Sequence, residues 1–221
     1  MSERRYPIYL LTFPSQYLLA ATFLRFQEHY ESPEFRGRVF TWEEFMDWYA
    51  RTRGKFSYLE DWGGFNIPDR VLRPFYDGAF DPLTGKEKKL LELLRGVKPP
   101  YYVIGTVNGG LNDMVHELVH GLFTTMPDYR RDVSGCLGRH DLTAARKILL
   151  KMGYCREVLD DELNAYLTTG LDGELKTQRR RLQPVKEELL GIFNRHFGLS
   201  VGDRRNWRRL LARTHRMKFR I

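Results

Sequence analysis

The sequence has little cysteine and no long apolar run. Its 221 residues include only Cys136 and Cys155, too few for the disulfide framework of a small secreted domain. The apolar run at residues 6–13 is shorter than a signal-peptide core with its cleavage site. No stretch approaches the roughly 18–20 apolar residues of a membrane span. We therefore expect a cytoplasmic protein with two buried thiols and no membrane partner.

Glycine and proline are close to average usage, and the sequence has no internal repeat. The 19 glycines and 10 prolines exclude collagen-like or low-complexity material. Hydrophobic residues make up 42% of the chain and aromatic residues 14%, which is enough to build a sizeable core. The composition therefore predicts a globular protein.

The excess of positive charge is local. The formal net charge is +8, but residues 179–221 hold 13 Lys and Arg against 3 Asp and Glu, a net charge of +10. The preceding 178 residues hold 23 against 25 and are nearly neutral. The basic character therefore belongs to the last part of the chain and not to its body.

Periodicity and capping residues divide the chain into three parts. Residues 1–100 are expected to be a mixed α/β part, 101–178 a catalytic strand–helix part, and 179–221 a basic helical end, the three forming one compact unit. Strands are expected at 6–13 and 101–107. Helices are expected at about 16–30, 42–53, 86–94, 112–125, 142–152, 158–169, 184–197 and 203–213. Ser15, Thr41 and Asn112 are candidate N-caps of three of these helices. Residues 108–110 are expected to form a turn, and Pro127 is expected to stop the helix that ends at about residue 125.

The most informative stretch is an HExxH motif, His116-Glu117-Leu118-Val119-His120. Two histidines four residues apart lie one helical turn above each other, so both imidazoles can reach one metal ion. Glu117 lies about 100° around the helix from His116. From there it can reach a metal-bound water as a base without itself binding the metal. A helix buried only for packing would have to bury two histidines and a carboxylate at considerable cost. The motif therefore favours a metal site.

A catalytic zinc usually has three protein ligands and an open fourth position. Glu162 is our candidate for the third ligand, because it lies on a predicted helix next to the apolar face that holds Ala165 and Tyr166. If the metal-bound water attacks a carbonyl group, an additional hydrogen-bond donor is needed to stabilise the oxyanion that forms. We expect this donor to be Tyr166, with His140 and Tyr154 as alternatives.

The pair of motifs, HELVH followed 42 residues after His120 by DELNAY around Glu162, resembles the gluzincins among the zincin metallopeptidases. The resemblance covers about residues 101–169, and the glutamate follows later than in thermolysin-type members. It implies an α+β, mainly helical zincin-like fold with a small mixed sheet and an HExxH active-site helix. It also implies a Zn²⁺ cofactor held by His116, His120 and Glu162, with Glu117 as general base in the hydrolysis of a protein or peptide substrate.

Other third ligands stay open. The metzincin pattern is excluded, since Phe123 and Met126 stand where glycine and histidine are required. His140 follows His120 by 20 residues, which is similar to SprT-like, DNA-associated proteases. A third hypothesis is a non-catalytic, metal-stabilised protein that binds nucleic acid or a partner, although an intact Glu117 argues against a purely structural site.

Residues around the motif have expected roles as well. Tyr102, Ile104 and Thr106 would bind an extended substrate if their strand lies at a sheet edge, although an interior strand explains the same pattern. Asp132 and Asp161 are candidates for holding the metal-binding imidazoles in place.

The basic end carries an apolar stripe at Trp207, Leu210 and Leu211. A basic helix of this kind can bind a phosphate backbone or an acidic partner, or can dock its stripe on the body of the protein. Residues 179–221 are therefore our candidate segment for a nucleic acid or an acidic partner.

Overall fold

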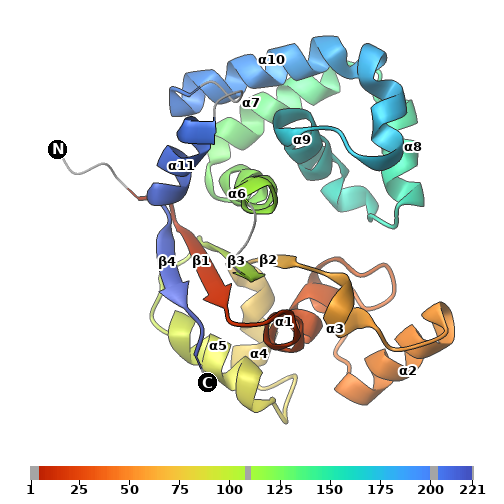
Figure 1. Cartoon of the computed structure of the whole chain (residues 1–221), viewed down its shortest axis with the longest axis vertical. Helices are drawn as coiled ribbons and strands as arrows, with labels where there is room; N and C mark the ends of the chain where they lie inside the picture. Colours follow the sequence, from red (N-terminus) through yellow and green to blue (C-terminus); the bar gives the residue numbers. More distant parts are fainter. Residues whose placement is uncertain (1–4, 108–110, 200–203, 221) are drawn as a thin grey trace. The chain divides into compact units, whose positions relative to one another are not determined.

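The structure is a computed structural model that describes residues 5–107, 111–199 and 204–220 (Figure 1). The protein is α+β and mainly helical, with a small mixed sheet of four strands. The fold class expected from the sequence is confirmed at this level. The turn expected at residues 108–110 lies outside the described residues, as does the side chain of Asn112, which the sequence indicated as a helix cap.

The chain forms two compact units. The sheet unit comprises Pro7–Gly110 and His215–Ile221, and the helical unit comprises Met1–Tyr6 and Leu111–Thr214. The chain is thus divided differently from the three parts expected from the sequence. The strand that precedes the HExxH helix belongs to the sheet unit, because it pairs with an N-terminal strand. The basic end belongs to both units, because its helices pack in one and its last strand pairs in the other.

The sheet unit begins and ends with strands of the same sheet. Its elements are β1 (Ile8–Phe13), α1 (Gln16–Glu31), α2 (Trp42–Arg53), α3 (Tyr58–Asp61), β2 (Gly64–Pro68), the 3₁₀-helix η1 (Asp69–Leu72), α4 (Arg73–Tyr76), α5 (Gly85–Leu94), β3 (Tyr102–Val107) and β4 (His215–Lys218). The capping residues read from the sequence are confirmed. Ser15 accepts a hydrogen bond from the backbone N–H of Leu18, and Thr41 forms a capping box with Glu44.

The strand order in the sheet is β2-β3-β1-β4. β1 lies parallel to both β3 and β4, and β2 runs antiparallel to β3. Thr106 of β3 is in register with Thr12 on one side and with Gly64 on the other. β3 is therefore an inner strand whose two sides are both paired. The edge position that would let Tyr102, Ile104 and Thr106 bind a substrate is therefore wrong, because the backbone groups of β3 pair within the sheet. The interior strand, which explains the same sequence pattern, is confirmed.

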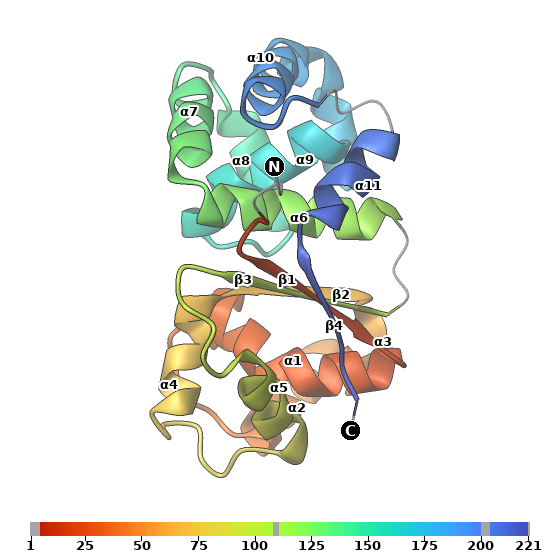
Figure 2. The ribbon, with the colours of Figure 1, turned by 90° about the vertical axis from the view of Figure 1, so that its left-hand side faces the viewer.

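The core of the sheet unit is aromatic, and α1 packs closely against one face of the sheet (Figure 2). A Cβ atom added at Gly105 of β3 would lie 2.5 Å from the Phe23 ring and 2.7 Å from Leu19 Cδ1. Phe23 and Leu19 are fully buried. Glycine at this position is what allows α1 to approach the strand so closely.

One ion pair is buried in this core. Arg25 of α1 contacts Glu87 of α5 through two bonds, Nε–Oε1 at 2.7 Å and Nη2–Oε2 at 2.6 Å, and the side chains are 4% and 0% exposed. The guanidinium also donates to the carbonyl of Phe80, and Glu87 accepts the backbone N–H of Thr84. The pair is thus surrounded by the hydrogen bonds that a buried charge requires.

The helical unit holds the HExxH segment. Its elements are α6 (Leu111–Thr125), α7 (Pro127–Gly138), α8 (Thr143–Lys151), the 3₁₀-helix η2 (Arg156–Val158), α9 (Leu159–Thr169), the 3₁₀-helix η3 (Gly173–Gln178), α10 (Arg179–Phe197) and α11 (Arg204–Ala212). α6 packs against α7 and α9, and α10 packs against the same two helices (Figure 1). α10 begins five residues before Pro184, which lies inside it, so the start predicted there is wrong.

Candidate metal centre

Helix α6 places His116 and His120 on one face. The helix forms because apolar residues recur at Val115, Leu118 and Leu122, which are buried. The two imidazole rings lie one turn apart, with their centroids separated by 4.9 Å. The spacing read from the sequence therefore brings both rings to the same place.

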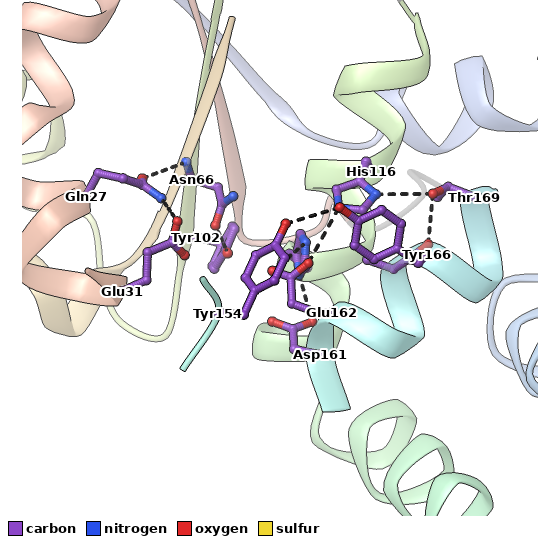
Figure 3. Close-up of polar contacts among 12 residues, drawn as sticks. Gln27, Glu31, Asn66, Tyr102, His116, Tyr154, Asp161, Glu162, Tyr166 and Thr169 are labelled. Atoms are coloured by element: carbon purple, nitrogen blue, oxygen red, sulfur yellow. Dashed lines mark hydrogen bonds and ion pairs between the residues drawn. The ribbon is translucent and has the colours of Figure 1, made fainter. Parts of the chain in front are cut away.

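Helix α9 brings Glu162 to these two rings, and Figure 3 shows it near His116. Its Oε2 lies 4.0 Å from Nε2 of His116 and its Oε1 lies 3.7 Å from Nε2 of His120. The three candidate donor atoms are all within 4.8 Å of one another. Ligands about 2.0–2.2 Å from a tetrahedral zinc ion are roughly 3.3–3.5 Å apart. Side-chain adjustments of less than about 1 Å would therefore close the group around a metal ion.

The other ring nitrogen of each histidine has a partner on α9. Nδ1 of His120 lies 2.9 Å from Oδ1 of Asp161, and Nδ1 of His116 lies 3.3 Å from Oγ1 of Thr169. The Thr169 hydroxyl gives its only proton to the carbonyl of Ala165, at 2.8 Å, so it accepts from the ring. His116 therefore carries a proton at Nδ1, and the Asp161 carboxylate favours a proton at Nδ1 of His120. The Nε2 atoms of both rings face Glu162. This is how metal-binding histidines are usually oriented.

The carboxylates set the charge of the site. Burial by itself would lower the pKa of His120, but Asp161 and Glu162 outweigh it and hold this pKa well above its usual value. Burial, followed by the charge of His120, lowers the pKa of His116 to about 3. Without a metal ion, the protonated ring of His120 thus offsets part of the negative charge of these carboxylates. A bound cation would take over this role.

Glu117 and Tyr166 lie in the same neighbourhood. The carboxylate of Glu117 contributes to the raised pKa of both His120 and Tyr166. The ring of Tyr166 packs edge-on against His116, with centroids 4.9 Å apart, and its hydroxyl is 3.1 Å from that of Tyr154. Burial is the main cause that raises the pKa of Tyr166. Its hydroxyl therefore stays protonated at neutral pH and can donate a hydrogen bond.

The rival third ligand lies elsewhere in the helical unit. Nε2 of His140 is 3.0 Å from Oε2 of Glu188 on α10, and among the described residues it groups with Cys136 and Glu188, not with His116 and His120. Asp132, one of the two candidates for holding an imidazole, contacts Nε2 of His196 at 2.8 Å. The other candidate, Asp161, is the one that contacts a ring of the HExxH motif, that of His120.

Sequence reasoning missed Thr169 at this site. It lies seven residues after Glu162, which is two helical turns, so the signal was the spacing along α9. Tyr154, which the sequence offers as an alternative donor, precedes η2 and belongs to no periodic pattern. Only the packing of the segment before α9 places its hydroxyl next to Tyr166.

The basic end presents charge around an arginine-lined cavity. Trp207, Leu210 and Leu211 of α11 are buried, as the apolar stripe predicts. A cavity of about 530 Å³ in the helical unit is lined by Arg5, Arg209, Arg213, Phe197, Gly198, Leu199 and Ala212. It contains no acidic side chain among these residues, so its electrostatic character is basic.

Comparison of the chain with protein-family models, with curated proteins and with solved structures found no match. Among the described residues, none of the helices has both the length and the apolar character that a membrane crossing requires. The cytoplasmic location stays a prediction from the sequence.

Proposed function

We propose that this protein is a zinc-dependent peptidase of gluzincin type, in which His116, His120 and Glu162 hold the metal ion and Glu117 is the general base. One observation carries the proposal. The Nε2 atoms of both histidines face the Glu162 carboxylate, while both Nδ1 atoms are bound by other residues of α9. A pair of histidines buried only for packing has no need of this orientation.

The donor set fits zinc. Two imidazole nitrogens and one carboxylate oxygen are the ligands of many catalytic zinc sites, and they leave a fourth position open. The same three donors are poor ligands for Ca²⁺ and Mg²⁺, which prefer oxygen. A bound zinc ion would polarise the substrate carbonyl and lower the pKa of water to about 7.

The residues of the chain would then move and hold protons. Glu117 would accept a proton from the attacking water and pass it to the leaving amine. The protonated hydroxyl of Tyr166 would donate to the oxyanion that develops on the carbonyl. Asp161 and Thr169 would hold the two imidazoles, so that Nε2 stays available on each ring.

The proposal is tested on the purified full chain with casein and a quenched peptide library as substrates. We expect hydrolysis that stops when a chelator removes the metal and returns when stoichiometric zinc is added. Hydrolysis that is unaffected by the chelator would contradict the proposal. Absence of zinc from protein purified without chelator, together with failure to bind added zinc, would contradict it as well.

The SprT-like alternative with His140 as third ligand has less support, because His140 contacts Glu188 and not the HExxH histidines. The non-catalytic alternative keeps the metal but gives no use for Glu117.

We propose in addition that the basic segment 179–221 binds an anionic partner, either nucleic acid or an acidic protein. The cavity lined by Arg5, Arg209 and Arg213 supports this, since arginine pairs well with phosphate and carboxylate groups. Binding to a labelled DNA duplex should weaken steeply with salt. It should also weaken in Arg209→Glu, whereas the exposed Arg51→Glu of α2 serves as a control for net charge. Equal weakening by both variants would contradict a specific role for the cavity.

A further inference from the structure

A second cluster of ligand-type side chains lies where α7 ends against α10. It consists of Cys136 on the last turn of α7, His140 just after that helix, and Glu188 on α10. One ligand atom from each residue lies within 4.8 Å of the others. Cys136 and His140 are four residues apart, and the chain continues through a turn in which the His140 N–H reaches the carbonyl of Leu137. This turn carries the imidazole to the same side as the thiol.

We propose that Cys136, His140 and Glu188 form a second metal site, which binds a divalent ion of the zinc class independently of the HExxH centre. A thiolate, an imidazole and a carboxylate are all zinc ligands, and a thiolate among them favours zinc or cobalt over Mg²⁺ and Ca²⁺. With three protein ligands, the fourth position is left for water. The site does not depend on the proposed peptidase function, because it shares no residue with it.

Arg139 holds the carboxylate of Glu188 in a suitable position. Its Nη2 contacts Oε1 of Glu188, while its Nη1 donates to the carbonyl of Gly135 at 2.9 Å. The other oxygen, Oε2, is 3.0 Å from Nε2 of His140. One carboxylate oxygen is thus bound by the guanidinium and the other faces the imidazole. Carboxylates that bind a metal ion are usually held by hydrogen bonds of this kind.

The exposure of the three residues suits a site that is filled from solvent. Cys136 is fully buried, whereas the side chains of His140 and Glu188 are 27% and 36% exposed. A metal ion can therefore enter from the side of His140 and Glu188. Once bound, it would connect the end of α7 to the middle of α10 and stabilise the helical unit by mass action.

A nucleophilic role for Cys136 fits less well. Burial, followed by the charge of Glu188, raises the pKa of its thiol to about 11. A reactive cysteine needs a lowered pKa and access to solvent.

Cobalt(II) chloride titrated into the metal-free full chain tests the proposal. Cobalt bound to a thiolate gives an intense near-ultraviolet charge-transfer band, which imidazole and carboxylate ligands do not give. We expect this band to saturate at about one equivalent of the thiolate-bound ion. It should be absent in Cys136→Ser, weakened at equal cobalt in Glu188→Gln, and unchanged in the matched control Cys155→Ser.

The HExxH centre contains no cysteine, so the band should persist in His116→Ala, whatever that substitution does to peptidase activity. Circular dichroism shows whether Cys136→Ser folds. If it does not fold, the half-buried Glu188→Gln variant provides the test instead. No band in the parent protein would overturn the second site. A band that Glu188→Gln leaves unchanged, or one that disappears in Cys155→Ser, would overturn it too.

Discussion

Nδ1 of His120 lies 2.9 Å from Oδ1 of Asp161, and Nε2 of the same ring lies 3.7 Å from the next residue of the chain, Glu162. Two adjacent residues of α9 therefore contact the two sides of one imidazole. Adjacent helical residues point about 100° apart, which is enough for their carboxylates to reach opposite ring nitrogens. In the proposed metal centre, this Asp-Glu dipeptide would supply both the third ligand and the group that orients the His120 ring.

The substitution Asp161→Asn is expected to lower zinc affinity about 10–100-fold, because the ring loses the charged acceptor that holds its Nδ1 proton. Zinc affinity is measured by competition with a chromophoric chelator. The matched control is Asp160→Asn, one residue earlier, whose carboxylate pairs with Arg146 at the surface. Equal affinities for the two variants would show that Asp161 has no role at the metal centre.

The substitution His140→Ala is expected to leave peptide hydrolysis and HExxH-bound zinc unchanged, since His140 contacts Glu188 and not the HExxH histidines. Two quantities are measured, namely hydrolysis of the peptide library and zinc content. The chain also carries Cys136→Ser, so that no ion bound to that cysteine is counted. If activity and the remaining zinc were lost together, His140 would be the third ligand and the SprT-like alternative would replace ours.

The substitution Glu87→Gln is expected to reduce the free energy of unfolding by about 3–5 kcal/mol, because it leaves the buried Arg25 charge without a counter-charge. Urea unfolding followed by far-ultraviolet circular dichroism measures the change. Asp77→Asn is the control, since Asp77 pairs with Arg73 at the surface and its side chain is 56% exposed. Its expected cost is about 0–1 kcal/mol. A similar small effect for Glu87→Gln would contradict the buried pair.

The substitution Gly105→Ala is expected to destabilise the protein by about 1–3 kcal/mol, since the added methyl group would overlap the buried Phe23 ring. Gly191→Ala of α10 is the control. Its nearest neighbour is Arg195 Nη1 at 3.8 Å, and alanine is the better helix former, so a stabilisation of about 0.5–1 kcal/mol is expected. Thermal unfolding of the two variants separates these outcomes, and a stabilising Gly105→Ala would show that α1 does not pack so closely on β3.

Local signals predicted many of the elements. The caps at Ser15 and Thr41 mark the starts of α1 and α2, and the four-residue spacing of His116 and His120 predicts that their rings share a face. These features depend on neighbours within a few residues. Glu162 was harder, since its proximity to the histidines depends on the packing of α9 on α6. The apolar residues beside it indicated a buried helix face, and this was enough to select it.

Features that depend on distant pairing were not predictable in the same way. The edge position expected for Tyr102, Ile104 and Thr106 is wrong, because β2 and β1 pair with the two sides of β3, and no local pattern reports sheet order. The sequence predicts no helix at α7, because Pro127 indicates a stop after α6. Proline at the first position of a helix is also a common start signal, and the structure shows the two helices separated by Met126 alone.

The central claim is that Glu117 does chemistry at a metal ion held by His116, His120 and Glu162. The most direct measurement compares bound zinc and peptide hydrolysis in the parent, Glu117→Gln and Glu162→Ala, all in the Cys136→Ser background so that only one site is counted. We predict that Glu117→Gln keeps about one zinc and loses hydrolysis by at least about 100-fold. Glu162→Ala should lose both zinc and hydrolysis. Full hydrolysis by Glu117→Gln, or undiminished zinc in Glu162→Ala, would contradict the claim.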